Sequence, residues 1–164
     1  MLKKIAVAAT LAVLASTSFA SDRAPIYVGT DLGTSKIDAF SGRTTGYGAY
    51  LGYALSPQFA FEIGYRNLGH FEERGVLARV HQSSFSMIGG IPMTTGVNLY
   101  GRLGFNRLSA QIEAGNLRES DSEGDFLMGV GVSYDINHEI TGRVEFQRLM
   151  NEANNVSVGV SVKF

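Results

Sequence analysis

The feature that most constrains the fold of this 164-residue chain is an alternation of apolar and small polar residues with a period of two. In a β-strand successive side chains point to opposite faces, so each alternating stretch predicts a strand with one apolar face. The pattern predicts strands over Ile26–Gly33, Thr44–Leu55, Phe59–Asn67, Val80–Ile91, Val97–Leu108, Phe126–Tyr134, Glu139–Leu149 and Val156–Phe164. No apolar run among them is long enough for a membrane helix, which needs about 20 residues. Eight consecutive strands can close into a barrel.

The two phases of the alternation differ in side-chain size. One phase carries Val, Leu, Ile and Phe, as at Val156 and Val158, and the other is mostly Gly and Ser, as at Gly46 and Gly48. Glycine accounts for 20 of the 164 residues, about 12% against a usual value of about 7%. In a soluble barrel, the alternative, the polar phase faces water and would be rich in long Lys, Glu and Thr side chains. Small residues instead fit the narrow interior of eight strands, so we predict an all-β, eight-stranded, up-and-down antiparallel transmembrane β-barrel.

The connections and the aromatic residues support the same interpretation. Short turns at Leu55–Gln58, Pro92–Gly96 and Asp135–His138 alternate with longer polar segments at Thr34–Arg43, Leu68–Arg79 and Ser109–Asp125. This alternation is typical of periplasmic turns and extracellular loops, and it places both termini on the periplasmic side. Aromatic residues form two levels, which predict girdles at the two headgroup layers: Tyr53, Phe59, Tyr134 and Phe164, then Tyr65, Phe85, Phe105, Phe126 and Phe146.

The N-terminus is typical of a secretory signal. Lys3 and Lys4 precede an apolar run over Ile5–Leu14, and small residues lead to a predicted cleavage after Ala20. We therefore expect residues 1–20 to be removed and residues 21–164 to form the barrel domain. The alternative, a retained anchor, conflicts with the shortness of the apolar run.

Composition excludes several classes of function. The formal net charge of −1 becomes −3 when Lys3 and Lys4 are removed, which is not the basic balance of a nucleic-acid-binding protein. Cysteine is absent, so the fold has no disulfides and no thiolate metal site. Stability must come from closure, packing or a membrane.

Several charged residues share the small-residue phase and should point into the lumen. Buried charges need partners, because an isolated buried charge costs several kcal/mol. We predict a lumenal ion-pair network formed by Asp31, Glu62, Arg66, Arg102, Arg143, Glu145 and Lys163. The simplest role for it is to fill the barrel, since eight strands enclose little space, and the alternative is a narrow or gated ion path.

The chain resembles the outer-membrane protein A-like family of small barrels. The resemblance rests on its Ile26–Gly29 opening, its Leu99–Phe105 strand and its closing strand, where Ser157, Gly159, Val162 and Phe164 resemble the C-terminal signal of outer-membrane proteins. It implies recognition by the β-barrel assembly machinery and lumenal bridges between Glu, Arg and Lys. Nothing follows Phe164 in this sequence, so we expect a barrel-only member without the peptidoglycan-binding domain of longer relatives.

One alternative function is enzymatic. His81 and Ser83 lie two residues apart on one strand, as do the lipid-facing His and Ser of a barrel lipid A deacylase. Nucleophilic catalysis also needs a third group that orients the base, and no carboxylate has a suitable height and phase. We therefore predict no enzyme and no catalytic residues.

Metal and cofactor sites are also not expected. The acidic run Asp121, Glu123 and Asp125 lacks the spacing of a calcium loop, and the three histidines are far apart. No glycine loop precedes a helix in the manner of a nucleotide site.

Together these features predict a structural and surface-interaction protein in the outer membrane of a Gram-negative bacterium. Its partners would be phospholipid and lipopolysaccharide around the barrel, and host or environmental ligands at the loops Ile37–Arg43, His70–Arg79 and Ser109–Asp125. A narrow channel and the lipid A-modifying hydrolase are the alternatives.

Overall fold

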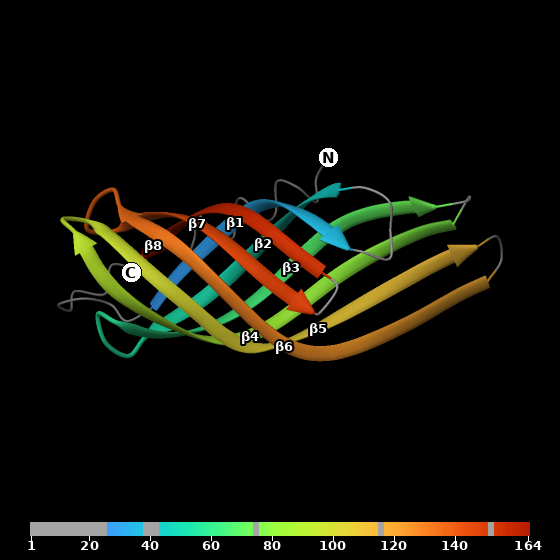
Figure 1. Cartoon of the computed structure of the whole chain (residues 1–164), viewed down its shortest axis with the longest axis horizontal. Coiled ribbons are helices and arrows are strands. Elements are labelled where there is room, and N and C mark those ends of the chain that lie inside the picture. The colour runs from blue at the N-terminus through green and yellow to red at the C-terminus, as the bar shows by residue number, and fades with distance from the viewer. Residues whose placement is uncertain (1–25, 38–42, 74–75, 115–116, 151–152) are drawn as a thin grey trace.

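The computed structural model describes residues 26–37, 43–73, 76–114, 117–150 and 153–164. The predicted signal segment lies outside them. The strands are β1 (Ile26–Ile37), β2 (Arg43–Ala54), β3 (Phe59–Glu73), β4 (Val76–Thr94), β5 (Val97–Ala114), β6 (Leu117–Asp135), β7 (Ile140–Met150) and β8 (Ala153–Lys163). Each strand pairs antiparallel with its neighbours in sequence, and β8 returns to β1, so the sheet is a closed barrel (Figure 1). The predicted fold class is confirmed.

Closure leaves no open edge in the sheet. The seam pairs Val28 with Val162 and Asp31 with Gly159, and the Phe164 amide donates to the Ile26 carbonyl at 3.0 Å. An unpaired backbone group in hydrocarbon costs several kcal/mol, so only a closed sheet can cross a membrane with strands. In the described part of the chain, no helix combines the length and the hydropathy needed to cross a membrane.

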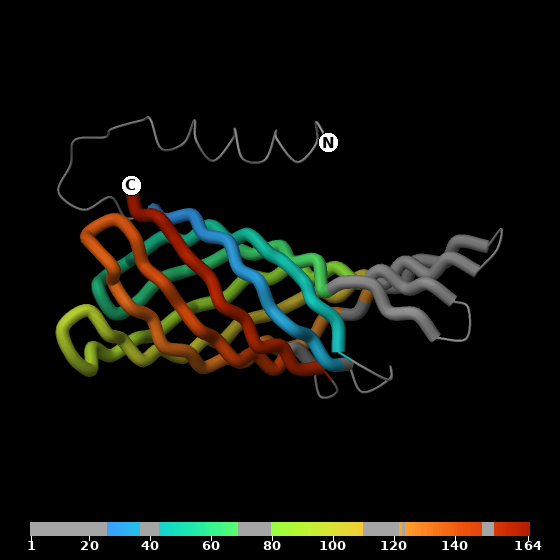
Figure 2. Tube along the Cα trace, turned by 90° about the horizontal axis from the view of Figure 1, so that it is seen from above, coloured from blue at the N-terminus to red at the C-terminus, as the bar shows by residue number. Residues whose placement is uncertain are grey.

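The two phases of the alternation point as predicted. Leu32 is 66% exposed and Val158 is 60% exposed on the outer wall, whereas Gly29 and Gly48 face inward and are buried. The described aromatic residues of both predicted girdles lie on the outer wall as well. The strands cross the barrel obliquely, and the described ends of the chain lie together with the short turns (Figure 2).

The short turns carry local signals that hold them in place. Gly96 has a φ of 80°, a left-handed conformation that glycine adopts without strain, in the turn between β4 and β5. At the turn before β7, the Asn137 side-chain oxygen accepts from the amides of Glu139 at 2.8 Å and Ile140 at 2.7 Å. Such bonds replace the missing ladder partners.

The long connections differ from the prediction. Segments expected to be loops within Leu68–Arg79 and Ser109–Asp125 are largely paired strand, and β3–β4 and β5–β6 extend beyond the other strands (Figure 1). The physical reason is that strand pairing does not require a membrane. In these extensions the alternation of the sequence ends although the ladder continues.

Candidate functional site

The lumen is crossed at its centre by Arg102, which projects from β5. Its guanidinium donates to Glu62 on β3 at 2.6 Å and to Glu145 on β7 at 2.5 Å. A third bond goes to the hydroxyl of Ser86 on β4 at 2.6 Å. Arg102 and both carboxylates are at most 4% exposed. One side chain therefore joins four strands across the barrel through charge-assisted hydrogen bonds.

Arg143 on β7 lies against the same carboxylates. Its Nη1 donates to Glu62 at 2.8 Å, and its guanidinium lies 3.5 Å from the centre of the Tyr50 ring. Nitrogen atoms of Arg143 also lie 3.9 Å from carboxylate oxygens of Asp31 and Glu145. The cation is stabilised by three acids and an aromatic face, away from water.

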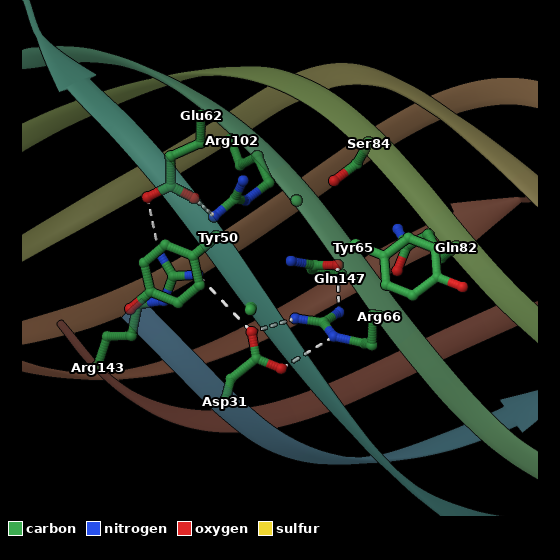
Figure 3. A pocket seen from close by; sticks show the side chains of 12 residues that line it. Asp31, Tyr50, Glu62, Tyr65, Arg66, Gln82, Ser84, Arg102, Arg143 and Gln147 are labelled. Carbon is green, nitrogen blue, oxygen red and sulfur yellow. Dashed lines mark hydrogen bonds and ion pairs between the residues drawn. The ribbon is translucent and has the colours of Figure 1, made fainter. Parts of the chain in front are cut away.

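Arg66 on β3 forms a second centre, next to the first (Figure 3). It donates to both oxygens of Asp31, at 3.0 and 2.8 Å, in a two-pronged contact. It also donates to the side-chain oxygens of Gln147 at 2.9 Å and Asn155 at 3.1 Å, and Asn155 donates to Ser35 at 2.9 Å. The chain of polar contacts therefore extends from mid-barrel towards the extracellular end.

Six of the predicted residues thus meet in one cluster. Its members carry equal numbers of positive and negative formal charges: Arg66, Arg102 and Arg143 with Asp31, Glu62 and Glu145. A neutral, fully hydrogen-bonded set can stay ionised in a low-dielectric interior, which an unbalanced set cannot. We call these six residues the lumenal cluster.

Lys163 does not belong to the lumenal cluster, and its assignment there was wrong. Its amine pairs with Asp135 at 3.1 Å at the periplasmic rim, where the Lys163 side chain is 43% exposed. Strand phase fixes the face of the sheet but not the height, and Lys163 lies at the very end of β8. Partial burial alone would raise the pKa of Asp135, but hydrogen bonds from Thr141 and Lys163 together with the lysine charge lower it.

Tyrosines complete the filling and explain some of the glycines. The Tyr27 hydroxyl donates to Glu62 at 2.8 Å, and that of Tyr100 donates to Glu145 at 2.8 Å. Tyr27 lies opposite Gly52 and its ring occupies the space that a Cβ there would need, so the glycine makes room for the ring. Neither tyrosine was among the predicted site residues.

Buried apolar residues in the extracellular half of the lumen were also missed. Four inward-facing apolar residues are at most 4% exposed, from four strands: Leu68, Val80, Leu127 and Ala153. In the sequence, these residues could have been recognised as apolar residues in the otherwise polar phase, at or near the predicted strand ends. The lumen is therefore not polar throughout.

Little space remains around the lumenal cluster. The cavity bounded by Asp31, Glu62, Arg66, Arg102 and Arg143 holds about 20 Å³. That volume suits about one water molecule. The lumenal cluster therefore occupies most of the lumen at this level.

His81 and Ser83 lie on the outer wall of β4. The His81 ring stacks on Tyr65 with 5.8 Å between ring centres, and its buried Nδ1 has no hydrogen-bond partner among the described residues. A general base needs an orienting group at that nitrogen.

No metal site was predicted at the acidic run Asp121, Glu123 and Asp125, and the structure describes only part of this run. The side chains of Asp121 and Glu123 are not among those that the structure describes. Among the side chains that are described, no group of three or more His, Asp or Glu is arranged to hold a metal ion.

The four residues of the predicted assembly signal lie along β8 and just after it. Ser157 and Gly159 face the lumen, Val162 faces outward, and Phe164 bonds to the first residue of β1. The strand that carries the signal is therefore also the strand that closes the barrel.

Residues 21–163 match the family model of the OmpA-like transmembrane domain. Outer membrane protein A of Shigella dysenteriae is 31% identical and is matched over 96% of this chain and 51% of its own length. That of Escherichia fergusonii is 32% identical over 73% of this chain and 40% of its own. The chain thus spans about half the length of these relatives, or less.

Solved structures share the fold. Neisserial surface protein A has a TM-score of 0.73 at 15% identity and covers 88% of this chain and 100% of its own. The N-terminal barrel domain of Pseudomonas aeruginosa OprF has a TM-score of 0.64 at 14% identity, covering 87% of this chain and 100% of its own. Ail of Yersinia pestis, in complex with the heparin analogue sucrose octasulfate, has a TM-score of 0.60 at 16% identity, covering 85% and 96%. The chain belongs to the OmpA-like transmembrane domain family and is a β-barrel of a Gram-negative outer membrane.

Proposed function

We propose that this protein is a non-conducting scaffold of the outer membrane that presents its extracellular hairpins to the surroundings. The observation that carries the proposal is the lumenal cluster, which fills the barrel with a neutral set of ion pairs and leaves about 20 Å³ beside it. A hydrated ion needs a continuous wet path. Buried apolar side chains in the lumen, Leu68 and Leu127 among them, offer a passing ion no polar partner.

Conductance tests the proposal against the channel alternative. Purified protein in planar lipid bilayers is expected to show no stable unit currents, because the lumenal cluster must break before an ion can pass. An Arg102→Met variant serves as the comparison, since Arg102 bridges Glu62 and Glu145. Unit currents in the wild type that disappear in this variant would show that the cluster forms an ion path and would refute the proposal.

The hairpins β3–β4 and β5–β6 support the surface role. They extend beyond the other strands on a rigid barrel, an arrangement that suits contact with ligands outside the cell (Figure 1). Ail, which has the same fold, was solved with a heparin analogue, so this architecture can hold a polyanion.

A deletion strain separates the scaffold role from the surface role. Complementation with the wild-type chain is expected to restore both the permeability barrier and adhesion to heparin-coated surfaces. A variant with both hairpins shortened to the length of their neighbours should restore the barrier but not the adhesion. Normal permeability and adhesion in the uncomplemented strain would count against both roles.

We further propose two points. The first is that the outer wall is non-catalytic. The second is that the β-barrel assembly machinery recognises the closing strand, with Phe164 at its end. His81 supports the first point, since no described carboxylate bonds to its Nδ1. The second rests on the likeness of Ser157, Gly159, Val162 and Phe164 to an outer-membrane assembly signal.

A further inference from the structure

Among the side chains that the structure describes, every charged one at the extracellular end of the outer wall is cationic. Four described side chains there are cationic and outward-facing: Lys36, Arg43, Arg107 and Arg148. The acidic side chains that the structure describes point into the lumen or lie at the periplasmic end. Charge on a lipid-facing wall is costly unless it lies at the headgroup level, and the strand register places these cations at or beyond the outer aromatic girdle.

Three of these cations lie on one face. Arg43 pairs across the sheet with Lys36, Lys36 pairs with Asn154, and Asn154 pairs with Arg148. We call Arg43, Lys36 and Arg148 the cationic rim; it runs over β2, β1 and β7, with the neutral Asn154 of β8 between Lys36 and Arg148. Arg107 on β5 lies on the opposite wall of the barrel, where it donates to the Ser122 hydroxyl at 3.2 and 2.6 Å.

A groove of about 490 Å³ runs below the rim on the same face. It crosses β1, β2 and β8 and is lined by Leu32, Gly33, Thr34, Arg43, Thr45, Val156 and Val158. Leu32 and Val158 give the groove an exposed aliphatic floor. Arg43 lines the groove and also belongs to the rim, so apolar and cationic surfaces meet in one site.

This combination selects a ligand with an acyl chain and an anionic head. A zwitterionic phospholipid offers no net charge to the rim. The phosphorylated glycolipid of the outer leaflet offers phosphates at headgroup level and acyl chains below them. Arginine binds phosphate through two-pronged, charge-assisted hydrogen bonds, and basic sites beside acyl chains hold anionic lipid heads in other membrane proteins.

We propose that this face is a binding site for lipid A, with Arg43 and Lys36 holding a phosphate and an acyl chain lying in the groove over Leu32 and Val158. Arg148 borders the site across Asn154. The site needs only the outer-membrane location, so it holds whether or not the lumen conducts and whether or not the hairpins bind a ligand.

Native mass spectrometry of the purified protein in a non-ionic detergent tests the site. The probes are lipid A and lipid A stripped of its phosphates. We expect the Lys36→Gln, Arg43→Gln double variant to bind lipid A about 10- to 30-fold more weakly than wild type, and to bind the stripped lipid as wild type does. Arg107→Gln is the matched control, because it removes one outward cation from the opposite wall, and it should change binding less than twofold.

A second variant tests the groove without changing charge. Thr45→Phe fills the groove beside the rim. It should weaken the binding of lipid A and the binding of the stripped lipid to the same extent. An unchanged urea midpoint, followed by far-UV circular dichroism, shows that each variant is folded. Equal binding of lipid A and its stripped form by wild type, or an Arg107→Gln loss as large as that of the double variant, would overturn the site.

Discussion

Replacing Arg102 with methionine is expected to lower the free energy of unfolding by about 3–5 kcal/mol, a large share of a small barrel's stability. The residue donates to Glu62, Glu145 and Ser86 in the closed interior of the barrel. Methionine fills similar space but leaves one negative charge without a counterpart. The cost comes from the uncompensated carboxylate, because a buried pair contributes little compared with what breaking it removes.

A second substitution separates charge balance from packing. Glu145→Gln in the Arg102→Met background restores equal numbers of positive and negative charges, and it should recover most of the lost stability. Arg107→Met is the control on the same strand, since Arg107 is exposed on the outer wall, and it should change stability by no more than about 0.5 kcal/mol.

Urea titrations in lipid vesicles measure these differences. The chain has no tryptophan, so the β-sheet signal in far-UV circular dichroism is the suitable probe. If the double variant were as unstable as Arg102→Met alone, the interior would depend on the shape of Arg102 and not on the balance of its charges.

The fold was predictable because the lipid-facing and lumen-facing sides of a membrane barrel need different residue types, which alternate along each strand. Lipid accepts only apolar side chains, and the narrow lumen accepts mostly small or paired polar ones, so a period of two with these contents has few other solutions. The same logic placed Glu62, Arg66 and Arg102 in one lumen. It did not show that Arg102 reaches two carboxylates, because that depends on the stagger between strands and on side-chain reach.

The misses occurred where the strands leave the hydrocarbon. Ser35 and Asn155 were excluded because the predicted strands stopped at Gly33 and started at Val156, whereas β1 and β8 continue and bring the two side chains to 2.9 Å. Lys163 shows the converse error. Its phase was right for the lumen, but at the rim water replaces the buried partners that phase alone implies.

Gly104→Ala is expected to be the most damaging small substitution in the wall, lowering stability by about 1–3 kcal/mol. An added Cβ would overlap the Phe85 carbonyl oxygen and lie 2.6 Å from the Ser86 Cα. Both are backbone atoms of β4, held by pairing with β5, so no side-chain rotation can relieve the contact. Relief would require the two strands to separate, which weakens their hydrogen bonds.

Gly101→Ala is the matched control, three residues earlier on β5 and on the opposite face. The nearest atom to a Cβ there is the Gly129 carbonyl oxygen at 4.0 Å, so alanine fits on the outer wall without contact strain. Alanine also restricts the unfolded chain, and the urea midpoint of Gly101→Ala should equal or exceed that of wild type. Similar losses in both variants would mean that β5 needs glycine for backbone freedom. A loss confined to Gly104→Ala would mean that it needs glycine because β4 and the lumen leave no room for a methyl group.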